Sequence, residues 1–116
     1  MDVYEIWVDL KPGIRDNQFA EALGHYLGAL KSDGKIESWR LLRRKLGLGP
    51  SSLGEFQILI ETRDMAQLDQ AFQAASRRAE PVESAHHGVN SLVVNFQAGL
   101  WRNFPDPHRQ HGGERF

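Results

Sequence analysis

Four segments of the chain alternate between hydrophobic and polar residues, which is the pattern of a β-strand with one buried face. The first segment alternates Tyr4, Ile6, Val8 and Leu10 with Glu5, Trp7 and Asp9. The other three cover about residues 36–46, 55–62 and 89–96. In the last of these we expect Leu92, Val94 and Phe96 to face the core, opposite Ser91, Val93 and Asn95.

Two segments between these strands have the 3.6-residue periodicity of amphipathic helices. The first helix is expected to begin after Asp16 as its N-cap. The second begins after Asp64, which forms a capping box with Gln67, and ends before Pro81. Residues 47–54 are rich in glycine and serine and predict a hairpin loop.

The resulting order, β-α-β-β-α-β, predicts a ferredoxin-like α+β sandwich. In this fold a four-stranded antiparallel sheet carries two helices on one face. We expect one domain over residues 1–104, followed by a flexible polar C-terminal tail over residues 105–116. Residues 100–104 are too apolar for such a tail, so they are expected to dock on their own subunit or to latch a partner.

The length and composition fit a single domain and bear on the expected cellular location. The 116 residues can bury a single core, and the chain has no cysteine for disulfides or thiolate metal sites. No segment has the length and hydropathy of a membrane span, and no signal peptide is evident, so we expect a cytoplasmic protein that does not bind membranes. The local basic run of residues 40–45 is interpreted as protection of an edge strand rather than as an anion clamp.

Nucleic acid is not an expected partner. The net charge is −1, and the outward face of the third strand carries Glu55 and Glu61. Acidic groups there would repel phosphates, and the aromatic signature of RNA recognition motifs is missing.

The sheet face opposite the helices is expected to hold the candidate binding site. It would carry Glu5, Trp7, Gln57, Leu59, Ser91, Val93 and Asn95. Leaving Trp7 and Leu59 in water would forgo several kcal/mol of burial, so a partner is expected to cover this face. A second copy of the chain is the simplest partner.

The element order, chain length and half-apolar sheet face resemble the dimeric α+β barrel superfamily over about residues 2–98. Three segments, 4–10, 43–50 and 86–92, are similar to a small uncharacterised bacterial family, known as a domain of unknown function, within that superfamily. The resemblance implies a homodimer whose two sheets face each other. It also implies a cavity of the kind that serves cofactor-independent monooxygenases, haem-degrading enzymes and lactone isomerases elsewhere in the superfamily. The haem-degrading pattern of Asn, Trp and His does not match the spacing here, so those roles are not transferred.

The histidine pair His86-His87 is the strongest chemical candidate, because imidazole moves protons near neutral pH. If the alternation of the last strand continues backwards, His87 shares the face of Asn95, and His86 contributes to substrate binding from the adjacent position. No HxH or HExxH spacing is present, so no metal site and no cofactor are predicted.

The sequence therefore predicts a homodimeric small-molecule-binding barrel, without deciding whether it is an enzyme. If it is, the expected chemistry is cofactor-independent oxidation or isomerisation of an aromatic or enolisable substrate. His87 would then accept a proton, Trp7 would form an apolar wall, and Asn95 or Gln57 would hold an oxyanion. The alternatives are a noncatalytic, stress-linked binding protein and a module whose open sheet docks another protein.

Overall fold

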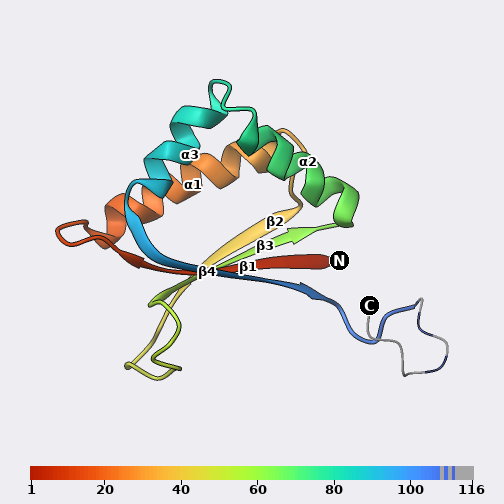
Figure 1. Ribbon diagram of the computed structural model, residues 1–116, viewed down its shortest axis with the longest axis horizontal. Coiled ribbons are helices and arrows are strands. Elements are labelled where there is room, and N and C mark those ends of the chain that lie inside the picture. The colour runs from red at the N-terminus through yellow and green to blue at the C-terminus, as the bar shows by residue number, and fades with distance from the viewer. Residues whose placement is uncertain (108, 110, 112–116) are drawn as a thin grey trace.

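Four antiparallel strands form a sheet, and all the helices lie on one of its faces (Figure 1). The structure, a computed structural model, describes residues 1–107, 109 and 111. Its elements are β1 Asp2–Leu10, α1 Asp16–Ser32, β2 Ser38–Arg43, β3 Phe56–Thr62, α2 Met65–Ser76, α3 Val82–Asn90 and β4 Val93–Arg102. The ferredoxin-like prediction is confirmed, with one helix more than expected. None of the helices in the described ranges combines the length and hydropathy that a bilayer span requires.

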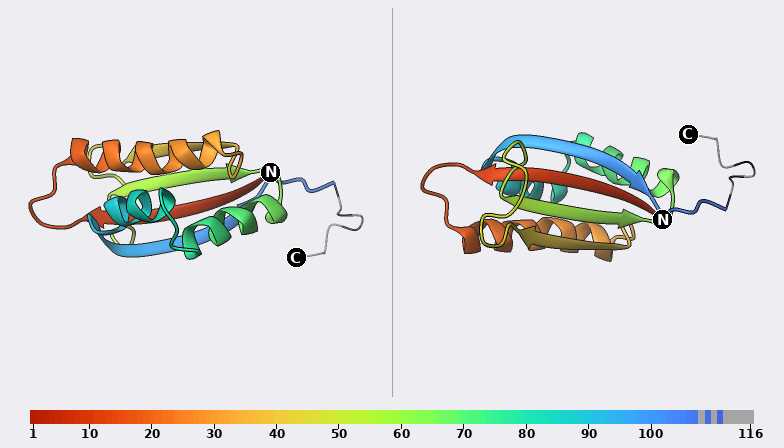
Figure 2. Two further views of the ribbon diagram at one scale, coloured as in Figure 1. Left: turned by 90° about the horizontal axis from the view of Figure 1, so that it is seen from above. Right: turned by 90° about the horizontal axis from the view of Figure 1, so that it is seen from below.

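The strand order is β2-β3-β1-β4, so β2 and β4 are the edges, as Figure 2 shows from both sides. Paired residues of antiparallel strands project to the same face. Ile6 pairs with Ile58 on the face toward the helices, whereas Trp7 pairs with Gln57 on the opposite face. We call this opposite face, which no helix covers, the free face.

The core lies between the sheet and the helices. Its buried residues come from β1, α1, the segment before β2, β3 and α2–α3: Val8, Phe19, Leu23, Leu27, Leu30, Ile36, Phe56, Ile58, Ile60, Ala71 and Val89. Phe19 of α1 meets Phe56 of β3 edge-to-face, with ring centroids 5.2 Å apart. This packing attaches α1 to the sheet; α3 lies beside α1, and α2 contacts α3.

Helix α3 was not predicted, and the expectation that a strand begins near residue 89 is wrong. Ala85 and Val89 lie one helical turn apart and are both buried. The helix spans only Val82–Asn90, which is too short for its periodicity to stand out beside the two longer helices. His86 and His87 therefore belong to a helix.

Strand β4 begins and ends later than expected, at Val93 and Arg102. Val93 pairs with Leu10 and faces the helices, while Val94 pairs with Asp9 on the free face. This reverses the predicted orientation of both valines. The register then shifts at a bulge where Asn95 has a φ of 58°, and the bulge returns Asn95 to the free face and Phe96 to the core side, as predicted.

The helix starts differ in how well the sequence predicted them. Asp64 caps α2 by accepting a hydrogen bond from the Gln67 amide at 2.9 Å, and the Gln67 side chain accepts one from the Arg63 amide. Asp16, however, is the first residue of α1 rather than its N-cap, which is Arg15. The Asp16 carboxylate instead pairs with Arg43 of β2 at 2.9 Å.

Residues 100–104 are the end of β4 and the turn after it. Residues 100–102 pair with residues 2–4 of β1, so this part of the segment lies against its own subunit, which was one of the two expected alternatives. The side chains of Leu100, Trp101 and Phe104 are nevertheless 51%, 56% and 84% exposed. The predicted tail, residues 105–116, lies mostly outside the described residues. In its described part, Asp106 pairs with Arg102 at 3.2 Å and with Arg109 at 3.6 Å.

Candidate functional site

The sheet divides the residues that the sequence grouped into one site. Glu5, Trp7, Gln57, Leu59 and Asn95 lie on the free face. His86, His87 and Val93 lie on the helix side, and Ser91 caps the end of α3 between the two groups. A single site in which His87 acts together with Trp7 and Asn95 is therefore wrong for one subunit, because the sheet itself stands between them.

Polar groups of the free face are paired with one another. Gln57 donates a hydrogen bond to Glu5, and Asn95 donates one to Asp9 at 3.1 Å. Asp9 also accepts a hydrogen bond from the Glu55 amide at 2.9 Å, and these two bonds, with that amide as the larger cause, lower the pKa of its carboxyl. Trp7 and Leu59 remain partly exposed between these pairs.

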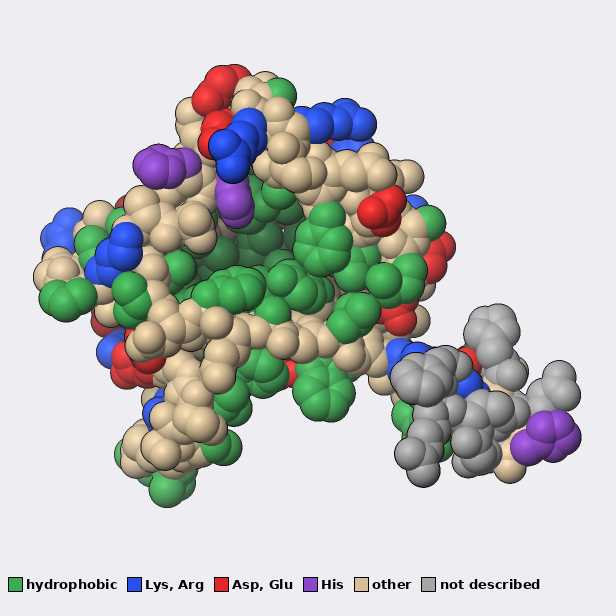
Figure 3. Space-filling view, viewed as in Figure 1, with side chains coloured by type: hydrophobic (Ala, Val, Ile, Leu, Met, Phe, Trp, Pro, Cys, Tyr) green, Lys and Arg blue, Asp and Glu red, His purple; other side chains and the backbone are tan. Residues whose placement is uncertain are grey.

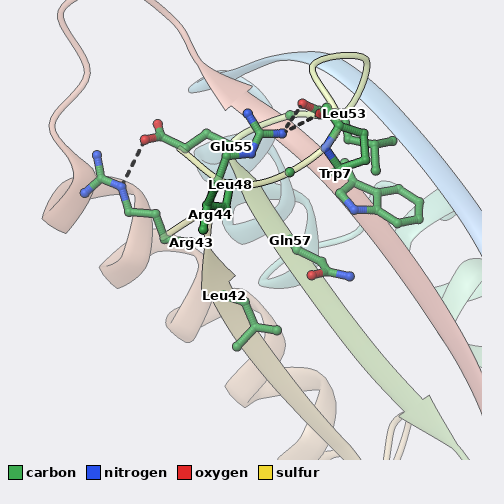
Figure 4. A pocket seen from close by; sticks show the side chains of 11 residues that line it. Trp7, Leu42, Arg43, Arg44, Leu48, Leu53, Glu55 and Gln57 are labelled. Carbon is green, nitrogen blue, oxygen red and sulfur yellow. Dashed lines mark hydrogen bonds and ion pairs between the residues drawn. The ribbon is translucent and has the colours of Figure 1, made fainter. Parts of the chain in front are cut away.

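A pocket of about 430 Å³, here called the loop pocket, lies on the free face beneath the β2–β3 loop (Figure 4). Its apolar walls are Trp7, Leu42, Leu48 and Leu53. The guanidinium of Arg44 donates to the carbonyl oxygens of Pro50 and Leu53, at 2.8 and 2.9 Å, and so holds the loop in its curled shape.

Two arginines of the basic run, Arg43 and Arg44, bond to groups of the protein itself. Arg43 bonds Asp16 at 2.9 Å and Glu55 at 3.2 Å, and its guanidinium lies 5.1 Å from the centre of the Phe56 ring. With Arg44 bound to the loop, neither arginine is arranged as an anion clamp.

A second, smaller space of about 80 Å³, here called the inner cavity, lies between the sheet and the helices. It is lined by Ile6, Val8, Phe19, Leu23, Tyr26, Leu27, Ile58, Ile60, His86, Val89, Asn90, Val93 and Phe96. Only Tyr26, His86 and Asn90 in this lining are polar. The ring of His86 lies against that of Tyr26, with centroids 5.3 Å apart and planes inclined by 47°.

A wider space of about 690 Å³, here called the outer hollow, lies beside the inner cavity between α2 and α3. His86 and Asn90 line both spaces, so they lie where the two adjoin. Phe72, Glu83 and His87 line only the outer hollow. Figure 3 shows this side of the molecule, where hydrophobic side chains line a depression between helices and sheet and a histidine lies on its rim.

Burial sets the protonation of Tyr26. Desolvation, with a smaller contribution from the nearby Tyr4, raises the pKa of the Tyr26 hydroxyl above its ordinary value of 10.0. Tyr26 is therefore protonated at neutral pH and can donate a hydrogen bond. Beside it, the imidazole of His86 offers ring nitrogens that can take part in proton transfer, so the wall of the inner cavity holds both groups in largely apolar surroundings.

Tyr26 and Asn90 were not predicted as site residues. Tyr26 falls in the first helix that the periodicity predicts, and Asn90 falls in the segment 89–96 that was expected to be a strand. The amphiphilic nature of tyrosine was the one available signal, since a buried hydroxyl usually has a partner or a role. Among the described residues, no three His, Asp or Glu side chains gather in a way that could hold a metal ion.

The sequence matches the model of a family of unknown function, DUF6614, over residues 1–116. The chain belongs to this family. The resemblance inferred from the sequence is thereby confirmed, but the family carries no assigned activity. No curated protein matches the chain.

Solved structures share the fold at low sequence identity. SnoaB, a cofactor-independent oxygenase from Streptomyces nogalater, is 8% identical, with a TM-score of 0.69, over 93% of this chain and 97% of its own. A dimeric ferredoxin-like protein of unknown function from Jannaschia sp. is 15% identical, with a TM-score of 0.60, over 89% and 100%. Another from Thermobifida fusca is 12% identical, with a TM-score of 0.55, over 87% and 90%. At these identities the likeness establishes the fold alone.

Proposed function

We propose that this protein is a homodimer that binds a small, flat phenolic or enolisable compound in the inner cavity, where His86 accepts a proton from it. The observation that carries the proposal is the pairing of His86 with Tyr26 in the wall of an otherwise apolar cavity. Polar groups placed in an otherwise apolar wall usually orient a ligand or take part in its chemistry.

The dimensions support a ligand that enters from the outer hollow. The inner cavity alone, at about 80 Å³, holds only part of a ring system, whereas the outer hollow adds about 690 Å³ of open space beside it. A fused aromatic ring would place its apolar end against Val8 and Ile58 and its oxygen beside His86, where the two spaces adjoin. The polar end of the ligand would then meet His86 and Tyr26.

The proposed chemistry begins with a proton transfer. The Nδ1 or Nε2 atom of His86 takes the proton of a phenol or of the carbon next to a carbonyl, which leaves an imidazolium and a phenolate or enolate. The Tyr26 hydroxyl donates a hydrogen bond to the resulting oxyanion. In an isomerisation His86 returns the proton to another carbon; in an oxidation, dioxygen is the co-substrate that accepts the electrons.

The homodimer is proposed on the free face. Trp7 and Leu59 lie there partly exposed, and both the Jannaschia and the Thermobifida proteins are dimeric ferredoxin-like proteins. Stacking two such sheets would bury these side chains at a typical sheet-to-sheet spacing of about 10 Å. The inner cavity stays open in this arrangement because it lies on the other side of the sheet.

Noncatalytic binding is the second candidate. It is favoured by the small volume of the inner cavity, which an apolar ligand fills without any reaction. It shares the binding site of the first candidate and differs only in whether the ligand emerges changed.

A titration with 2-naphthol, a flat phenol, tests the proposal. The bound phenol should broaden or shift the NMR signals of His86 and Tyr26. The substitution His86→Ala should weaken binding by roughly fivefold to tenfold, as expected for the loss of one hydrogen bond of about 1 kcal/mol.

The matched control is His25→Ala in α1, where the side chain is exposed and lines neither the inner cavity nor the outer hollow. It should bind 2-naphthol like the unmodified protein. Equal effects of the two substitutions, or no binding of any naphthol at millimolar concentration, would refute the proposed site.

A further inference from the structure

We infer that each copy of the chain inserts Trp101 into the loop pocket of the other copy. The inference rests on the proposed homodimer and specifies which parts of the two free faces meet. The proposed occupant of the loop pocket is thus a side chain of the second copy and not a small molecule.

Trp101 has the features of an interface side chain. It pairs with Val3 at the end of the sheet farthest from the β2–β3 loop and projects on the free face, where it is 56% exposed. The neighbouring Gly99 makes room for its indole, since a Cβ at Gly99 would lie 3.1 Å from the indole nitrogen. Large aromatic side chains exposed in this way are the commonest anchors of protein interfaces.

The loop pocket has the matching form. Its volume of about 430 Å³ and its leucine and tryptophan walls suit an aromatic ring. The loop is held in shape without a partner, because Arg44 bonds two of its carbonyl oxygens. Yet Leu48, a wall of the pocket, is 76% exposed, so the pocket is left unfilled by its own chain.

Symmetry supports this pairing. The loop projects from the free face at one end of the sheet in Figure 1, and Trp101 lies on β4 near the other end. A two-fold axis in the plane between two stacked sheets can carry one end of the first sheet over the other end of the second. Both tryptophans then meet both pockets at once, which makes the contact self-complementary.

Cross-linking tests the arrangement, because the chain contains no cysteine of its own. The doubly substituted chain V3C/L48C keeps Trp101 and places one thiol beside it and the other at the loop pocket. With a short bis-maleimide, this variant should yield covalent dimers. The single variants V3C and L48C should not, because in each dimer their two thiols lie at opposite ends.

Dissociation supplies the second readout. Trp101→Ala should raise the dimer dissociation constant at least tenfold in dilution experiments followed by light scattering. The control Leu46→Ala removes a leucine of the β2–β3 loop that is 83% exposed and does not line the pocket, and it should change the constant less than twofold.

The outcomes separate this inference from the proposed function. Cross-linking of L48C to itself, or dimers in which Trp101→Ala has no effect, would overturn the inference and leave the homodimer in place. A monomeric protein would overturn both the inference and the homodimer. Binding of 2-naphthol in the inner cavity is measured independently of either result.

Discussion

The carboxylate of Asp9 in β1 connects the β2–β3 loop and β4 on the free face. It accepts hydrogen bonds from the Glu55 amide at the end of the loop and from Asn95 in the β4 bulge. These bonds lower its pKa in the folded state. Their contribution to the free energy of unfolding is therefore complete above the ordinary Asp pKa of about 4 and disappears as the pH falls through the lower folded-state value.

The lowered pKa of Asp9 gives the first prediction, which concerns how stability depends on pH. Between pH 7 and pH 3, urea unfolding should show a larger loss of stability for the unmodified protein than for Asp9→Asn. Asp33→Asn is the control, since Asp33 is exposed and its carboxylate has no hydrogen bond within the described residues. Parallel pH curves for the unmodified protein and Asp9→Asn would contradict the role given to this carboxylate.

Gly54 gives the second prediction, because the loop returns there directly against β1. A Cβ on Gly54 would lie 2.5 Å from the backbone carbonyl of Val8, which cannot move aside. Gly54→Ala should therefore cost about 1–3 kcal/mol of unfolding free energy.

The control for Gly54 is Gly28→Ala, in α1, where nothing lies within 4 Å of the added methyl group. Helix propensity should make that substitution stabilising by roughly 1 kcal/mol. Thermal melts of both variants measure the difference, and equal melting temperatures would show that Gly54 is not confined by β1.

Single residues were predictable where the interaction is local. The Asp64 cap acts within three residues of sequence, and it was read correctly. The contact of His86 with Tyr26 joins positions 60 residues apart on two helices, one of which had not been recognised. The local pattern of either segment carries no information about a contact between the two. The sequence could therefore indicate a candidate histidine but not the residue that it contacts.

At the level of elements, β4 shows how one short helix redirects a site. Strands and helices place side chains with different periods, so a helix read as a strand reverses the inferred faces beyond it. Val93 and Val94 were reversed for this reason. Asn95 and Phe96 were placed correctly because the bulge at Asn95 shifted the register back by one residue.

The bulge gives the third prediction. Asn95 adopts a φ of 58°, a region that asparagine and glycine tolerate and β-branched residues do not. Asn95→Val should destabilise the protein by about 1–3 kcal/mol, whereas Asn95→Gly should lose little beyond the hydrogen bond to Asp9. Urea denaturation distinguishes them, and equal stabilities would contradict a backbone role for the bulge.

At the level of the whole molecule, the edge position of the second strand and the position of the helices on one face could be predicted. Both follow from the order of patterned segments, because few topologies satisfy that order. The position of the site could not be predicted, since each face of the sheet forms its own pocket. The free face offers a surface for a second copy, while the helix side offers a cavity for a small molecule.

The most direct measurement is therefore of the face that holds the ligand. Isotope-filtered NOE spectra of the protein with bound 2-naphthol would show which protons lie within about 5 Å of it. The account predicts contacts with Tyr26, Ile58 and His86. Contacts with Trp7 and Leu59 instead would place the ligand on the free face and contradict the proposed function.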